Sequence, residues 1–204
     1  MAAPRTARLC DHAGVDSDAE VEPGTLLVAA PQLLDENFRR SVVYVIHHRE
    51  EGTLGVILNR PSEVAVSDVL PQWAPHASDP QSLFVGGPVE QRTAICLAAL
   101  RTGEDVRAVD GMVGVRGPIG LVDLDRDPAA LVPRTRGLRF FAGYAGWEAR
   151  QLAGEIERGD WIVVPALPDD VLAEPGSDLW GRVLRRQRTP LAFLATHPGD
   201  VKLN

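Results

Sequence analysis

The side chains best suited to bind a ligand in this 204-residue chain are an amide and a guanidinium that end an apolar run. Residues 53–59 read as a strand, and Asn59 and Arg60 stand at its end, directly before Pro61. A guanidinium can bind a carboxylate or a phosphate through two parallel hydrogen bonds. Arg60 is therefore a candidate clamp for a small anion. The alternative is a strand end at which Arg60 pairs with an acidic neighbour.

A histidine offers acid–base chemistry on the preceding run. His47 and His48 are adjacent, so a strand turns their side chains to opposite faces and they cannot share a metal ion. As a general base, His48 would need a carboxylate to orient it, and Glu50 and Glu51 are near in sequence. The alternative is a partly buried histidine that closes the strand against the hairpin.

Two consecutive glycines mark a second candidate surface. Gly86 and Gly87 allow the backbone to approach a ligand closely. Their N–H groups could hold an anion, although Pro88 offers none. The alternative is a tight turn that packs against another strand.

A short polar segment between two apolar runs carries the remaining candidates. Asp35, Phe38 and Ser41 could line part of a pocket. Alternatively, Asp35 caps the turn, Phe38 fills the core and Ser41 bonds to the backbone. The full candidate surface for a ligand or a partner comprises Asp35, Arg39, His48, Asn59, Arg60, Gly86 and Gly87.

Several chemistries lack the residues that they need. The only lysine is Lys202, near the end of the chain, which argues against Schiff-base catalysis and against a Walker A nucleotide site. The chain also lacks the HExxH, paired CxxC and GxSxG patterns that are typical of zinc sites and of serine hydrolases. The sequence therefore predicts no metal and no cofactor, identifies no catalytic residue, and favours a protein that is not an enzyme.

The charge of the chain bears on its partners. The formal net charge is −7, which disfavours non-specific binding to nucleic acids and to anionic membranes. A predicted helix over residues 177–187 carries an arginine-rich face that could meet nucleic acid or an acidic protein, or could simply be solvated. No helix–turn–helix pattern precedes it, so direct DNA binding is not expected. The expected partner is an unknown protein or a small anionic ligand.

The cysteines and the apolar runs favour a cytoplasmic protein. Cys10 and Cys96 are too few for a disulfide framework. No apolar run reaches the roughly 20 residues of a membrane helix. The first residues include two arginines but no apolar core after them, so we do not expect a secretory signal.

Three apolar runs organise the first part of the chain. Residues 25–30, 42–48 and 53–59 read as strands, and the polar link 49–52 predicts an antiparallel hairpin between the last two. The run 42–48 is apolar on both faces, so we expect a central strand that is covered on both sides.

Short strands dominate the remainder as well. We expect further strands at 83–85, 93–100, 121–124, 139–144 and 161–166, and helices at 67–70, 147–158 and 177–187. Strand 93–100 is expected to pair with 83–85. The glycines at 111, 114, 117 and 120 are interpreted as strand kinks and turns.

The predicted fold is α+β, with mostly antiparallel β-sheets flanked by a few short helices. We expect a single compact domain at residues 22–189. Residues 1–21 lack periodicity and are predicted to be a disordered N-terminal tail, and residues 190–204 are assigned to a C-terminal tail.

Four motifs in order resemble a known family of small bacterial proteins. The first is Asp35-x-x-Phe38-x-x-Ser41, followed by His48, Gly52 and Gly55, and the second is Asn59-Arg60-Pro61. The third is Gly86-Gly87-Pro88-Val89 and the fourth is Gly143-Tyr144-Ala145-Gly146-Trp147. In this order and spacing, residues 23–188 resemble the AlgH/YqgE family.

The resemblance implies a compact α+β domain without a demonstrated reaction, in a family whose name reflects an association with regulation. One segment departs from the family pattern, because Arg150-Gln151-Leu152-Ala153 stands where the family usually has Gly-Gln-Leu-Glu. The missing catalytic patterns and the resemblance together predict a non-enzymatic regulatory or interaction protein. The alternative is a protein that binds, or acts on, a small anionic metabolite through Arg60 and the Gly86-Gly87 turn.

Overall fold

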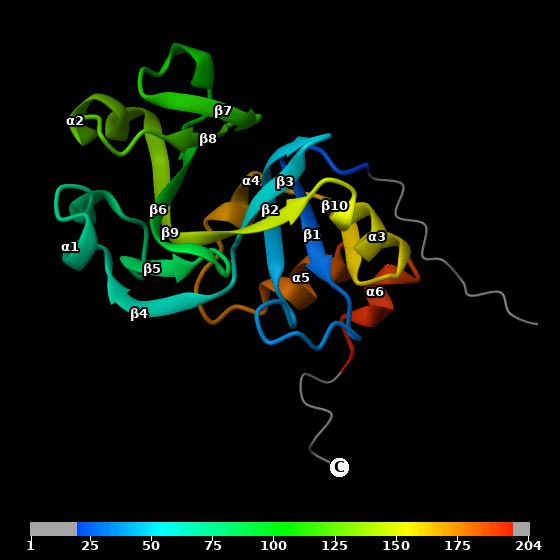
Figure 1. Cartoon of the computed structure of the whole chain (residues 1–204). Helices are drawn as coiled ribbons and strands as arrows, with labels where there is room; N and C mark the ends of the chain where they lie inside the picture. The colour runs from blue at the N-terminus through cyan, green and yellow to red at the C-terminus, as the bar shows by residue number, and fades with distance from the viewer. Residues whose placement is uncertain (1–19, 198–204) are drawn as a thin grey trace, which may run out of the picture.

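The computed structural model describes residues 20–197, and one curled β-sheet forms its centre (Figure 1). Eight strands follow one another in the order β10-β1-β2-β3-β9-β6-β8-β7, while β5 pairs with β9 and β4 pairs with β5. Every pairing is antiparallel except that of β5 with β9. The strands are β1 (Thr25–Ala29), β2 (Val42–Arg49), β3 (Gly52–Ile57), β4 (Pro61–Ala65), β5 (Ser82–Val85), β6 (Val89–Leu100), β7 (Met112–Arg116), β8 (Ile119–Val122), β9 (Thr135–Glu148) and β10 (Trp161–Pro165).

Short helices lie against this sheet. The α-helices are α1 (Val66–Val69), α2 (Pro128–Leu131), α3 (Gln151–Glu157), α4 (Pro168–Val171), α5 (Leu179–Arg185) and α6 (Leu191–Leu194). Three 3₁₀ turns are η1 (Ala74–His76), η2 (Val106–Ala108) and η3 (Val132–Arg134). No helix within residues 20–197 has the length and apolar character that a membrane crossing requires. The predicted α+β fold, mostly antiparallel sheet with short helices, is confirmed.

The predicted tails fall largely beyond this range. Residues 1–19 of the expected disordered tail lie outside the described residues, and so do residues 198–204. Within the expected C-terminal tail, α6 packs against α5. The domain limits of 22 and 189 stay a prediction.

Strand β2 is covered on both faces, as its sequence predicts. Val42 and Tyr44 belong to a core cluster that includes Val183 of α5. Val43 and Val45 point the other way, into a second cluster with α3. Alternate side chains of a strand face opposite sides, so a strand that is apolar throughout fits only a doubly covered position.

Strand β9 links the two halves of the molecule. Its first part pairs with β5 and β6, and its last part pairs with β3. Figure 1 shows it running from the lobe of β5 and β6 to the lobe of β1, β2 and β3. The helix expected at 147–158 is therefore too long, because Trp147 is still in β9, where it is buried opposite Thr53, and α3 begins only at Gln151.

The pairing expected for residues 93–100 is wrong. These residues belong to β6, which pairs with β8 and β9. Strand β5 has no free edge for β6, because β9 lies on one side of it and β4 on the other. Strand β4 is not evident in the sequence, because it begins at Pro61 and proline usually ends a strand. Here the proline is tolerated because β4 is an edge strand that pairs only with β5.

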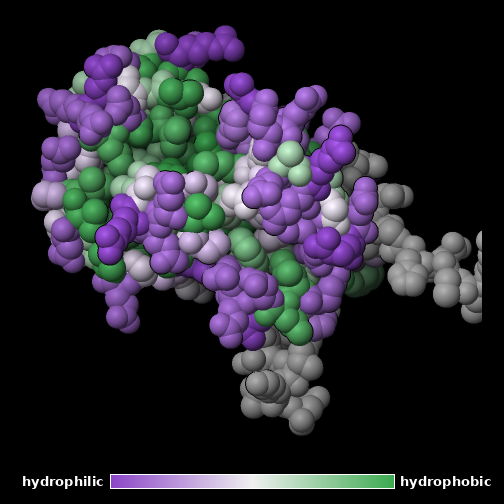
Figure 2. All heavy atoms as spheres, in the orientation of Figure 1, coloured by the Kyte–Doolittle hydropathy of each residue, from purple (hydrophilic) through white to green (hydrophobic). Residues whose placement is uncertain are grey.

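The last strands of the sheet fold back toward its beginning. Residues 112–122, where the glycines predicted kinks and turns, form the β7–β8 hairpin. Arg116, at the end of β7, donates a hydrogen bond to Oε2 of Glu22 at 2.7 Å and lies against Gly24, which precedes β1. Figure 2 shows apolar surface over the lobe of β6 and β8, where Ile95 and Leu121 are only partly buried.

Three glycines let the β5–β6 connection cross β9 backbone to backbone. A Cβ atom on Gly86 would collide with the carbonyl of Gly143, and one on Gly87 would collide with the main chain of Tyr144. Gly143 itself has φ +70°, and a Cβ atom there would lie 2.6 Å from the carbonyl oxygen of Val89. The connection therefore fits against β9 only because these positions carry no side chain.

We expect Gly143→Ala to lower the free energy of unfolding by more than about 3 kcal/mol, because it combines left-handed backbone strain with a backbone collision. Gly103→Ala is the matched control. Gly103 has φ +89° but open space around its missing Cβ, so we expect a loss of about 1 kcal/mol. Urea denaturation of both variants measures the difference, and equal losses would show that the crossing carries no energetic weight.

Candidate functional site

The segment that holds Asp35 and Arg39 is an exposed loop between β1 and β2, residues 31–41, called the 31–41 loop below. Asp35 shapes this loop from within. Its Oδ1 atom accepts a hydrogen bond from the N–H of Asn37 at 2.9 Å, and its carbonyl oxygen accepts from the N–H groups of Phe38 and Arg39. These contacts are those of a turn cap.

Phe38 anchors the middle of the loop in an aromatic cluster. Its ring stacks on Trp147 at a centroid distance of 5.9 Å and meets the edge of Trp161 at 5.4 Å. The indole N–H groups of both tryptophans donate to Oε2 of Glu155, each at 2.8 Å. Residues of β9, β10 and α3 thus hold the loop from one side, and the carboxylate satisfies both indoles.

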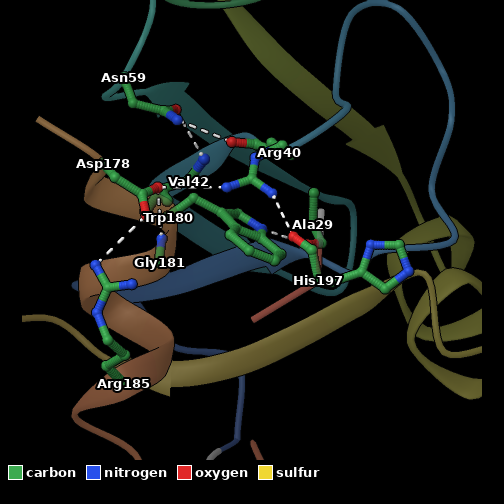
Figure 3. A network of polar contacts seen from close by, with 9 residues as sticks. All are labelled: Ala29, Arg40, Val42, Asn59, Asp178, Trp180, Gly181, Arg185 and His197. Atoms are coloured by element: carbon green, nitrogen blue, oxygen red, sulfur yellow. Dashed lines mark hydrogen bonds and ion pairs between the residues drawn. The ribbon is translucent and has the colours of Figure 1, made fainter. Parts of the chain in front are cut away.

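Arg40 fixes the end of the loop (Figure 3). Its guanidinium carbon lies 4.0 Å from the centroid of the Trp180 ring, and Nη1 donates to the carbonyl oxygen of His197 at 3.2 Å. Nη2 lies 3.5 Å from Oδ1 of Asp178, the residue that caps α5. The backbone of Arg40 has φ +55°, a strained conformation that persists only where its surroundings hold it.

Asn59 joins the loop to the end of β3. Its Nδ2 donates to the carbonyl oxygen of Arg40 at 2.8 Å, and its Oδ1 accepts from the N–H of Val42 at 3.0 Å. Figure 3 shows the amide between these two backbone groups. Both halves of the amide are therefore used within the fold.

Arg60 lies beside the loop and is partly buried. Its Nη2 donates to the carbonyl oxygen of Arg39 at 3.3 Å. Burial lowers the pKa of the Arg60 guanidinium, the nearby Asp35 carboxylate raises it, and Arg39 lowers it. Between residues 20 and 197 no carboxylate forms an ion pair with Arg60, so the anion clamp stays a prediction.

The double glycine lies next to Arg60. The N–H of Val85 donates to the carbonyl oxygen of Arg60, and the N–H of Ile57 donates to that of Gly86, each at 2.8 Å. The fold thus brings the end of β3 and the glycine turn together. Gly86 and Gly87 are both buried against β9, however, which is the packing that the tight-turn alternative describes.

His48 stands apart from this group. It is exposed near the far end of β2, six residues from Val42, which corresponds to roughly 20 Å along a strand. Its Nδ1 atom lies 2.7 Å from Oγ1 of Thr53, its neighbour across the hairpin. Among the described residues its partner is thus a hydroxyl and not Glu50 or Glu51.

Two features of the site are not evident in the sequence. Arg39 and Arg40 are adjacent and identical in type, and only the left-handed backbone turns Arg40 onto Trp180. Ser41 is fully buried, and the expected bond from its hydroxyl to the backbone is not formed, because the hydroxyl has no partner within the described chain; only its backbone N–H donates to the carbonyl oxygen of Phe38. Over residues 20–197, no three His, Cys, Asp or Glu side chains are grouped closely enough to hold a metal ion.

Comparison with known proteins adds the family context. The model of a family described as AlgH-like (DUF179) matches residues 26–192. A UPF0301 protein of Mycolicibacterium smegmatis is 58% identical over 184 residues, which cover 90% of this chain and 92% of the relative. A UPF0301 protein of Mycobacterium tuberculosis is 56% identical over 184 residues, which cover 90% of this chain and 91% of the relative.

Two solved structures are similar to this one. A Corynebacterium diphtheriae protein of known crystal structure is 44% identical in sequence and superimposes with a TM-score of 0.84. The match covers 87% of this chain and 93% of the Corynebacterium chain. The AlgH protein from Pseudomonas aeruginosa, of known solution structure, is 27% identical in sequence and superimposes with a TM-score of 0.63. The match covers 87% of this chain and 95% of the Pseudomonas chain. None of these names states a reaction or a ligand.

The departure from the family pattern has a structural counterpart. Arg150 stands where the pattern usually has glycine, and its backbone has φ +64°, directly before α3. Glycine adopts this conformation without the steric penalty that other residues meet. The structure therefore explains the usual glycine by backbone geometry at the start of α3.

We expect Glu155→Ala to lower the free energy of unfolding by about 2–4 kcal/mol, because the indole N–H groups of Trp147 and Trp161 lose their acceptor. Glu155→Gln keeps one carbonyl oxygen and should lose less. Glu157→Ala, an exposed position on the same helix, should change stability by about 0.5 kcal/mol or less. Chemical denaturation followed by tryptophan fluorescence measures all three, and similar losses at both positions would contradict this role of Glu155.

Proposed function

The chain belongs to the AlgH-like family, and on that basis we propose that it is a non-enzymatic interaction protein with a regulatory role. The observation that carries the proposal is the 31–41 loop, which is exposed and polar but is held from both sides. Phe38 fixes its middle, while Arg40 and Asn59 fix its end. A structureless connection between two strands would need none of these contacts.

Such a loop is suited to recognition. An ordered loop loses little conformational entropy when a partner binds, and binding residues are often found on loops that a rigid scaffold positions. The outward side chains combine an apolar group with charges, since Leu34 is 69% exposed and Glu36 and Arg39 are exposed beside it. An apolar anchor with a polar rim is typical of protein-binding surfaces.

We also propose a cytoplasmic location, which the cysteines support. Cys96 is a free thiol inside the core, and burial raises its pKa well above the ordinary value. A buried thiol of this kind is unreactive, and unpaired cysteines are typical of reducing compartments.

A photocrosslinking amino acid at position 34 tests the interaction surface. Position 113 is the matched control, because Leu34 and Val113 are both 69% exposed, but Leu34 lies in the 31–41 loop and Val113 lies in β7. We expect a crosslinked species of defined mass in living cells from position 34 and none from position 113. Glu36→Lys, which reverses an exposed charge of the loop, should reduce the yield about tenfold. Equal crosslinking from both positions, or none from position 34, would refute the proposed surface.

A second candidate function is the binding of a small anionic metabolite by Arg60. This candidate does not require that the protein also convert the metabolite. The supporting observation is electrostatic. Arg60 is partly buried, and burial lowers its pKa; the nearby Asp35 carboxylate raises the pKa and the neighbouring Arg39 lowers it. A phosphate or carboxylate between the two guanidinium groups would offset the repulsion between them. Because Gly86 and Gly87 are buried, their contribution would be to position Arg60 and not to contact the ligand.

A thermal-shift screen with inorganic phosphate, pyrophosphate and dicarboxylates tests this second candidate. A ligand at 100 times its Kd should stabilise the protein by about 2.7 kcal/mol. Arg60→Ala should abolish the shift, whereas Arg182→Ala, an exposed arginine of α5, should retain it. Identical shifts in the two variants would exclude Arg60 as the binding group.

A further inference from the structure

Residues of β9, α4 and α5 surround a depression of about 560 Å³ on the surface of the protein. Leu167, Leu172 and Ala173 form its apolar part, and Leu167 is 51% exposed. Concave sites of roughly 300–1,000 Å³ that combine apolar walls with a few polar groups are typical of small-molecule binding. The other lining residues are all charged, and they are Arg136, Asp169, Asp170, Glu174, Arg182 and Arg186.

Four of these six charged side chains are paired with one another. Arg136 of β9 forms an ion pair with Asp169 of α4. Asp170 is buried, and its two carboxylate oxygens accept hydrogen bonds from Nη1 and Nη2 of Arg186 at 2.7 and 2.6 Å. Oδ2 of Asp170 also accepts from the N–H of Leu167 at 2.7 Å, where α4 begins. These contacts tie α4 to β9 and to the end of α5, so the walls of the depression are joined.

The remaining two charges are of opposite sign and unpaired. Arg182 lies on α5, Glu174 lies in the link between α4 and α5, and both are exposed. Within residues 20–197, no ion pair or side-chain hydrogen bond engages the guanidinium of Arg182 or the carboxylate of Glu174. Both line the same depression, yet they do not pair with each other. The depression therefore offers one free donor group and one free acceptor group.

This distribution of charge limits the class of ligand. The lining has three arginines and three carboxylates, so its formal charges cancel. A ligand with only negative charge would be attracted by Arg182 but repelled by Glu174, and a ligand with only positive charge would meet the reverse. A zwitterion satisfies both groups, because its carboxylate accepts from the guanidinium while its ammonium donates to the carboxylate.

We propose that this depression binds a zwitterionic amino acid or short peptide that carries an aliphatic side chain. The ligand carboxylate lies on Arg182, the ligand ammonium lies on Glu174, and the aliphatic side chain packs on Leu167 and Leu172. The site shares no lining residue with the 31–41 loop or with Arg60, so it is a separate binding site of the same chain.

Chemical-shift titration of the full chain with leucine and with the dipeptide leucyl-leucine tests the proposal. At least one of the two should bind, and the tighter one shows whether an amino acid or a peptide fits better. Acetylating the ammonium or amidating the carboxylate of that ligand should each weaken binding about tenfold. Glycine or glycylglycine should also bind about tenfold more weakly, because neither buries an aliphatic side chain.

Two variants assign each ligand charge to a residue. Arg182→Ala should weaken binding of the zwitterion about tenfold but leave the affinity of the amidated analogue unchanged, since that analogue has already lost the contact. Glu174→Gln should act in the same way on the acetylated analogue. Arg188→Ala is the matched control, because Arg188 is an exposed arginine outside the depression, and it should change no affinity. All three positions are exposed, so the variants should fold.

The proposal is overturned if neither probe binds, or if the blocked analogues bind as tightly as the zwitterion. It is also overturned if Arg182→Ala and Glu174→Gln both keep the wild-type preference for the zwitterion, because the ligand would then lie elsewhere. Arg60→Ala should leave the affinity unchanged. A loss of binding in that variant would assign the ligand to the Arg60 surface and refute a separate site.

Discussion

The tightest packing constraint in this structure is the point where the backbone of the β5–β6 connection crosses the backbone of β9. Gly86, Gly87 and Gly143 meet there with no side chain between the two backbones. The crossing holds β5 parallel to β9 while β6 runs antiparallel to the same strand. It also sets the position of Arg60, whose carbonyl oxygen accepts from the N–H of Val85 just before the glycines. The binding surface proposed beside Arg60 would thus depend on glycines that do not themselves reach it.

The same strand supports the 31–41 loop from a distance. β9 ends with Trp147, on which Phe38 stacks, and Glu155 of α3 ties Trp147 to Trp161 of β10. The other end of the loop rests on α5 through Arg40 and Trp180. Elements that follow residue 135 therefore shape a loop that precedes residue 42. Such a loop is held in place only in the complete fold, which is consistent with the interaction surface proposed for it.

Three arginines show how differently one side chain can be accommodated. Arg186 has a buried carboxylate, Arg40 has an aromatic ring and a shared carboxylate, and Arg139 has an aromatic ring and a single carbonyl oxygen. The cost of burying a charge depends on its partners and not on its type. Burial without a carboxylate is what separates Arg139 from the structural ion pairs of the same chain.

The sequence by itself determined the family, the α+β class and the double coverage of β2, because motif spacing and the alternation of side chains are local properties. It also located the turn at Gly86-Gly87. Only the tertiary structure decided that residues 93–100 pair with β8 and β9, that Trp147 extends a strand, and that Arg40 turns inward while Arg39 stays exposed. Strand partners, buried charges and left-handed residues depend on segments far away in the chain, and no local pattern records which of them will meet.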